Sequence, residues 1–77
     1  MRIDIHLLGY LARFSPTKKE KFQLEFPNGA TINQLLEEIE LPADLSKVVL
    51  VNGCHGNGSA RLAAGDEVSI FIPEAGG

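Results

Sequence analysis

The sequence predicts an α+β domain in which a mixed sheet of four to five strands is covered on one face by one main helix. Several short segments alternate between apolar and polar residues, which indicates half-buried strands. One segment instead carries apolar residues at helical spacing behind a clear helix start. Glycine and proline turns separate these segments, in the order strand, strand, helix, strand, a loop with room for a short strand, and a last strand.

The two opening strands are predicted at residues 2–8 and 21–26, because apolar and polar side chains alternate in both segments. A long connection joins them, so we expect a hairpin with an extended loop. Within that loop, residues 11–14 fit a short helical turn that ends at Pro16.

The main helix is predicted to begin behind Thr31, a favourable N-cap residue. Gln34 stands three residues later and completes a capping box. Apolar residues then recur at helical spacing as far as Ile39, and Pro42 is expected to stop the helix. The helix has a single apolar stripe, so it should pack across one face of the sheet.

Two more strands are predicted in the second half of the chain. Residues 48–51 form a continuous apolar run rich in β-branched side chains, which favours a buried strand. Residues 54–59 read as a polar, glycine-rich loop, and residues 67–72 alternate as a last strand that Pro73 ends. We therefore expect one domain at residues 1–73 and a flexible C-terminal tail at residues 74–77.

Composition limits the classes of function. With 77 residues, of which 44% are hydrophobic, the chain is near the lower size at which one core folds unaided. Little apolar material is left for a deep substrate pocket, which argues against a self-contained enzyme with a complete active site. The net charge of -3 and the lack of a basic face argue against nucleic-acid binding. Three clustered lysines, Lys18, Lys19 and Lys21, fit a solvated turn better than an electrostatic docking feature.

The number of cysteines and the composition of the N-terminal segment indicate where in the cell the protein is expected. Cys54 is the single cysteine, so no intramolecular disulfide forms, and zinc sites of the usual kind need several Cys or His ligands. Asp4 and His6 interrupt any signal-peptide core, and no apolar run reaches transmembrane length. We expect a cytoplasmic protein without a metal and without membrane contact.

Several segments carry a resemblance to a known family. Phe26 to Ile32 followed by a Leu-Leu pair, residues 51–53, residues 62–68 and residues 70–77 are similar to corresponding parts of the ubiquitin-like β-grasp fold. In combination they resemble the MoaD/ThiS family of prokaryotic sulfur carriers over nearly the whole chain. The long first connection and the ending Phe71-Ile72-Pro73 resemble the MoaD branch, the small subunit of molybdopterin synthase.

The resemblance implies a chemistry for the tail. In the family, a ubiquitin-activating-type enzyme uses ATP to adenylate the terminal glycine, here Gly77, and a persulfide enzyme then supplies the sulfur of a thiocarboxylate. The acceptor would lie on the large subunit of molybdopterin synthase or on a thiazole synthase. No cofactor would be bound permanently. Gly76 and Gly77 lack a Cβ, so the tail can thread a narrow channel in its partner, and we expect that nothing has to be cleaved from Gly77 before activation.

A docking surface is expected beside the tail. Phe71 alternates away from the apolar side of its strand, and parallel first and last strands of a β-grasp sheet would place His6 and Leu8 near it. These three residues and Pro73 are the predicted partner-binding residues. A structural or incidental loop cysteine is the preferred interpretation of Cys54, because His55 beside it would point the opposite way and no third group orients the pair.

Three alternatives to a molybdopterin-type carrier stay open from the sequence. The first is a ThiS-type carrier for thiamine thiazole synthesis. The second is a ubiquitin-like modifier that forms isopeptide bonds with lysines. The third is a β-grasp interaction module whose tail is inert. The sequence does not name the acceptor.

Overall fold

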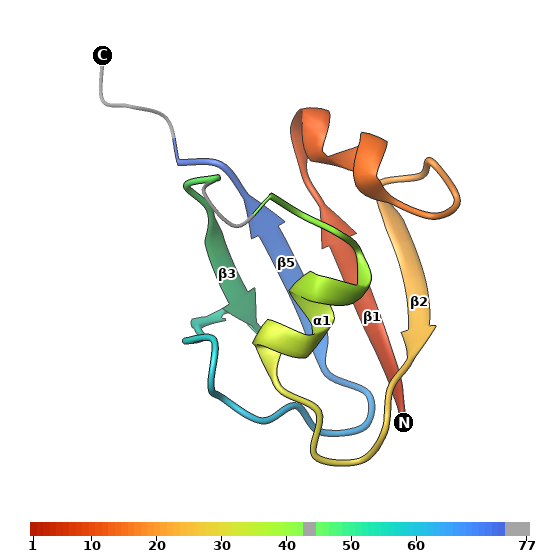
Figure 1. The fold of residues 1–77 in the computed structure, drawn as a ribbon, viewed down its shortest axis with the longest axis vertical. Helices are drawn as coiled ribbons and strands as arrows, with labels where there is room; N and C mark the ends of the chain where they lie inside the picture. The colour runs from red at the N-terminus through yellow and green to blue at the C-terminus, as the bar shows by residue number, and fades with distance from the viewer. Residues whose placement is uncertain (43–44, 74–77) are drawn as a thin grey trace.

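The architecture is a five-stranded mixed sheet with a short helix across one face, seen in a computed structural model that describes residues 1–42 and 45–73 (Figure 1). The elements are β1 (Arg2–Leu7), η1 (Gly9–Phe14, a 3-10 helix), β2 (Lys21–Glu25), α1 (Ile32–Glu38), β3 (Val48–Val51), β4 (Cys54–His55) and β5 (Glu67–Phe71). The predicted order of elements is confirmed. The short helical turn in the first connection and the short strand in the loop both form.

The strand order places the last strand in the middle of the sheet. The order is β2-β1-β5-β3-β4, with β5 parallel to β1 and antiparallel to β3. β1 and β2 form the expected antiparallel hairpin, and β4 adds a two-residue antiparallel edge to β3. The predicted mixed sheet and the predicted parallel pairing of first and last strands are therefore confirmed.

The start of α1 follows the predicted capping box. The Thr31 Oγ1 accepts a hydrogen bond from the Gln34 backbone N–H, and the Gln34 Oε1 accepts one from the Thr31 backbone N–H at 2.8 Å. These two bonds satisfy amide groups that have no partner inside the first turn. Ile32 and Leu35 are then buried against the sheet.

The end of α1 differs from the prediction. The helix ends at Glu38, before Pro42, with Ile39 as its C-cap. Glu40 has a φ of 57°, the left-handed conformation that commonly follows a helix end and cannot continue the helix. Pro42 therefore lies beyond the end of the helix and does not stop it.

The core fills the space between α1 and one face of the sheet. Ile3, Ile5 and Leu7 of β1 alternate into it, as do Val68 and Ile70 of β5. Residues 48–51 were expected to be buried throughout, but in β3 only Val49 is buried and the other three are half-buried. Val48 and Leu50 point to the second face of the sheet, which α1 does not cover, whereas Val51 packs only partly against the core at the end of the strand. In the described ranges, no helix is long and apolar enough to cross a membrane.

Side-chain hydrogen bonds join two turns that are far apart in the sequence, one at Asn52 and one at Asp66. The Asn52 Nδ2 donates to the Asp66 Oδ1 at 2.9 Å, and the Asn52 Oδ1 accepts from the Glu67 backbone N–H at 2.9 Å. The other oxygen of Asp66 accepts from the Ala63 backbone N–H at 2.8 Å. We call Asn52, Ala63, Asp66 and Glu67 the turn network. Its bonds fix the start of β5 against the end of β3.

Candidate partner-docking site

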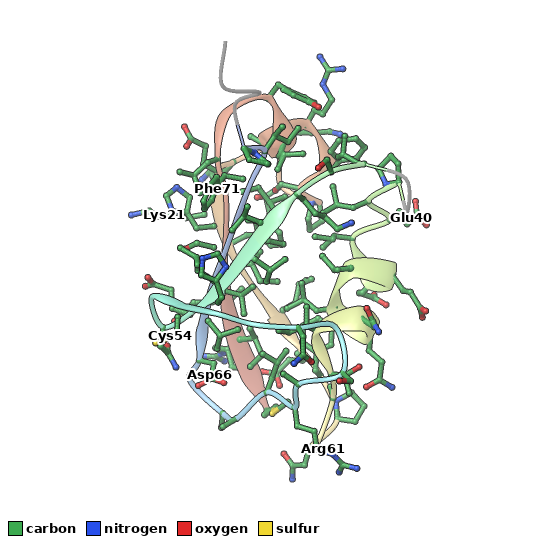
Figure 2. All side chains as sticks on the ribbon, turned by 90° about the vertical axis from the view of Figure 1, so that its left-hand side faces the viewer. Lys21, Glu40, Cys54, Arg61, Asp66 and Phe71 are labelled. Atoms are coloured by element: carbon green, nitrogen blue, oxygen red, sulfur yellow. The ribbon has the colours of Figure 1, made fainter. Side chains whose placement is uncertain are left out.

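The sheet has an open face on the side opposite α1. Side chains that alternate away from the core on β1 and β5 lie there, including His6, Ser69 and Phe71. Figure 2 shows Phe71 and Lys21 on the opposite side of the sheet from the helical segment that leads to Glu40. This face is open to contact with another molecule.

The strand register arranges the open face in rows. One row runs across all five strands, because His6 pairs with Lys21 and Ser69, and Leu50 pairs with Ser69 and His55. In the next row, towards the C-terminal end of β5, Phe71 pairs with Val48. The open face is therefore more polar in the row of His6 and Ser69, and apolar at the C-terminal end of β5.

An apolar hollow of about 290 Å³ lies at that end of the sheet. It is lined by Leu8, Gly9, Tyr10, Phe71, Ile72 and Pro73. The Leu8 backbone N–H donates to the Ile70 carbonyl at 3.0 Å, which continues the pairing of β1 with β5 and brings Leu8 beside Phe71. The large hydrophobic side chains that are exposed in the described residues are Leu8, at 36%, and Tyr10, at 55%, and both line this hollow.

Three of the four predicted partner-binding residues are thus brought together: Leu8, Phe71 and Pro73. His6 shares their face but lies one row away, opposite Ser69. It lines a second hollow of about 280 Å³ together with Asp4, Lys21 and Glu67, among others. Its Nε2 is 3.5 Å from a carboxylate oxygen of Glu20. The structure therefore assigns His6 to a polar hollow and not to the apolar one.

Sequence reasoning missed three lining residues of the hollow, Gly9, Ile72 and Tyr10, and of these Tyr10 has the large exposed side chain. It belongs to η1, whose irregular spacing predicted a helical turn but not which side chains face solvent. The Arg13 guanidinium carbon lies 5.7 Å from the centroid of the Tyr10 ring, a cation–π contact at the same surface. The sequence held one signal for this role: Tyr10 is an aromatic residue in a loop between two strands. Such a residue stays exposed unless the loop folds its side chain onto the core.

The predicted catalytic residues Gly76 and Gly77 lie outside the described residues, as does the expected tail at residues 74–77. The chain is described as far as Pro73, which lines the apolar hollow. Figure 1 shows that β5 ends at the same end of the sheet as η1. The last described residue, Pro73, therefore lies at the rim of the hollow.

The Cys54–His55 pair shows no catalytic arrangement. Both residues are exposed on β4, where Cys54 pairs with Val51 and His55 pairs with Leu50. Neighbouring residues of a strand point to opposite faces, as expected for this pair. Across residues 1–42 and 45–73, no group of three or more His, Cys, Asp or Glu side chains could hold a metal ion.

A parallel β1–β5 pair at the centre of a mixed sheet, with α1 across one face, defines a ubiquitin-like β-grasp domain. The chain matches the model of the ThiS family over residues 6–77, and it therefore belongs to the ThiS family. No curated protein matches the chain. The predicted β-grasp fold and the predicted MoaD/ThiS relationship are both confirmed.

Solved structures agree on the fold. SAMP1 from Haloferax volcanii superposes with a TM-score of 0.81 at 22% identity, over 100% of both chains. A putative molybdopterin converting factor subunit 1 from Pyrococcus furiosus gives 0.79 at 21% identity, over 94% of this chain and 97% of that one. Subunits 1 and 2 of the molybdopterin-converting factor from Helicobacter pylori were solved as a complex, in which the matching chain gives 0.66 at 20% identity over 100% of both chains.

Proposed function

We propose that this protein is a sulfur carrier whose C-terminal carboxylate, on Gly77, is adenylated and then converted to a thiocarboxylate. The observation that carries the proposal is the apolar hollow at the point where β5 leads into the Gly-Gly tail. Membership of the ThiS family supports it. An exposed apolar surface beside a tail that has to enter a partner's active site fits a protein that docks in order to be modified.

The chemistry needs an activated carboxylate, because a carboxylate alone is a poor electrophile. An adenylating partner of the ubiquitin-activating type would join Gly77 to AMP and release pyrophosphate from ATP. The terminal sulfur of a persulfide enzyme would then attack the acyl carbon and expel AMP. A second thiol would then attack the enzyme's sulfur in the resulting S–S bond, form a disulfide with it and release the thiocarboxylate. Glycines at both final positions keep side chains out of the channel and away from the acyl carbon.

Molybdopterin synthesis is the pathway we propose, with this chain as the small subunit of molybdopterin synthase. Two of the structures similar to it carry the name molybdopterin converting factor subunit 1 or contain that subunit, and one of them is a complex with subunit 2. A large-subunit partner would cover the open face near Phe71 and receive the tail. The thiocarboxylate would then act as the sulfur nucleophile towards a pterin precursor.

A ubiquitin-like modifier is the second candidate, favoured by the similarity to a protein described as small archaeal modifier protein 1. In that case the activated Gly77 carboxylate would form an isopeptide bond with a lysine of another protein. A ThiS-type carrier for thiamine thiazole synthesis would share the loading chemistry and differ only in the acceptor.

Intact-mass spectrometry tests the proposal. The full chain is incubated with ATP, the adenylating enzyme of its own organism and a persulfide donor. A mass gain that equals replacement of one oxygen by sulfur supports the carrier, and adducts on the lysines of other proteins support the modifier. If neither the adenylate nor the thiocarboxylate forms, and deletion of Gly77 leaves function intact, the sulfur-carrier function is wrong. A large synthase subunit or a thiazole synthase encoded beside this gene would separate the two acceptors.

A further inference from the structure

We propose that Tyr10 and Arg13 of η1 extend the apolar hollow into a two-part docking surface, whose cationic part pairs with a carboxylate side chain at the rim of the adenylating enzyme's tail channel. This inference rests on the proposed function. The apolar part would be buried by apolar side chains of that enzyme. The cationic part would fix the orientation in which the tail enters.

The first support is the position and exposure of Tyr10. Its side chain lines the hollow with Leu8 and Phe71, yet it is 55% exposed. Tyrosine and arginine are enriched where proteins bind each other, because both combine a large contact area with directed polar groups. A Tyr–Arg pair at the edge of an apolar hollow has the composition of such an interface.

The second support is the charge of Arg13. Ion pairs within 4 Å in the described part of the chain involve the N-terminus, Arg2 and His6 as cations, and Arg13 is in none of them. The chain as a whole carries a net charge of -3, so acidic groups are plentiful elsewhere on its surface. The guanidinium lies instead against the Tyr10 ring, at 5.7 Å from the centroid. Its hydrogen-bond donors can therefore meet a carboxylate supplied by another protein.

The third support is that this part of the loop is anchored. Leu11 is completely buried in the core, and the Ser15 side chain is 1% exposed. The Ser15 backbone N–H donates to the Ala12 carbonyl at 3.0 Å, and the Lys18 Nζ donates to the Arg13 carbonyl at 2.9 Å. Tyr10 and Arg13 are thus presented from a fixed turn, so that less conformational entropy is lost on docking than from a flexible loop.

The arrangement favours a protein partner over a nucleic acid. Nucleic-acid affinity depends on neutralising several phosphates with clustered cations. The hollow is lined by apolar side chains, and the cations nearby are the Arg13 guanidinium against Tyr10 and the Lys18 ammonium, which donates to the Arg13 carbonyl. An apolar patch with few charges at its rim matches the usual anatomy of a protein interface, with a polar rim around an apolar centre.

The test compares charge reversals at two ends of the molecule. Arg13→Glu and the control Arg61→Glu make the same change in net charge. Arg61 is exposed and lies at the opposite end of the molecule from Phe71 in Figure 2. The dissociation constant for the adenylating enzyme is measured at low and at high salt, and loading of Gly77 is followed at saturating enzyme by intact mass. Tyr10→Ala, Tyr10→Phe and Arg13→Lys complete the series, and circular dichroism verifies folding.

We expect Arg13→Glu to weaken binding roughly tenfold or more at low salt. The loss should shrink at high salt, and loading at saturation should be unchanged. Arg61→Glu and Tyr10→Phe should bind like the wild type, Arg13→Lys should retain part of the affinity, and Tyr10→Ala should weaken binding at both salt concentrations. Equal losses for Arg13→Glu and Arg61→Glu, or no loss for either, would overturn the inference while wild-type loading still supports the carrier. Failure of the wild type to be loaded would overturn both.

Discussion

The two ends of the central strand β5 differ in their surroundings: one end is held by hydrogen bonds within the chain, and the other borders an exposed apolar hollow. At its start, the turn network joins Asn52, Asp66 and two backbone amides in three hydrogen bonds of 2.8 to 2.9 Å. At its other end, Phe71 and Pro73 line a hollow with exposed Leu8 and Tyr10. One end satisfies its polar groups within the chain, and the other leaves apolar groups uncovered. We infer from this contrast that the turn network of this chain holds the fold together, whereas the surface around Pro73 is left open for the proposed partners.

The largest effect is expected at the very end of the chain. Deletion of Gly77 should reduce loading with sulfur by at least ~100-fold, because the shortened tail would leave the carboxylate displaced from the attacking group. The melting temperature should not change, since the last two glycines follow the folded domain. Intact mass after incubation with ATP and partner enzymes, beside a thermal melt, measures both. Normal loading of the shortened chain would contradict a role for the terminal carboxylate of Gly77.

Phe71 tests the apolar end more directly. Phe71→Ala should weaken partner binding by about 2 kcal/mol, as for a central interface residue. It should cost less than ~1 kcal/mol of unfolding free energy, because the side chain is half-buried and points away from the core. Titration calorimetry with the adenylating enzyme and urea unfolding report the two quantities. A stability loss larger than the binding loss would mean that Phe71 serves the fold and not docking.

Asp66 tests the other end of the comparison. Asp66→Ala removes the acceptor of the Asn52 amide and of the Ala63 backbone N–H, and should cost about 1.5 kcal/mol of unfolding free energy. For a domain of this size that corresponds to a fall of roughly 6–12 °C in the melting temperature. Loading with sulfur at a temperature where the variant is folded should match the wild type. If loading fails although the variant is folded, the turn network has a role beyond structure.

Only a small effect on stability is expected at Tyr10. Tyr10→Ser should change the unfolding free energy by no more than ~0.5 kcal/mol, because more than half of the side chain is already exposed. Urea unfolding measures it. A clear destabilisation would show that Tyr10 packs as part of the fold, and the contrast between the two ends would then weaken.

Much of this molecule follows from local rules. Alternation identified β1, β2 and β5, a continuous apolar run identified β3, and Thr31 with Gln34 marked the start of α1. The proximity of Leu8 to Phe71 followed once the parallel pairing of β1 and β5 was expected. These features depend on neighbours in sequence or on a single topological assumption.

Other features could not be predicted because they depend on tertiary contacts. The hydrogen bond between Asn52 and Asp66 joins residues 14 positions apart. Each residue is already accounted for by its own turn, so the local sequence gives no reason to expect a contact between them. The exposure of Tyr10 depends on how a 3-10 helix without clear periodicity sits on the sheet. His6 was expected beside Phe71, but the register pairs it with Ser69, one row away. Periodicity gives the face of a residue, and only the register gives its row.

The central position of β5 also has a mechanical consequence. The strand that leads into the tail is hydrogen-bonded on both sides, to β1 and to β3. A pull on the tail along the axis of β5 loads both ladders in shear, so that many hydrogen bonds resist together instead of opening one after another. Under the proposed function, a partner enzyme that draws on the tail would therefore load the centre of the sheet and not a single edge strand.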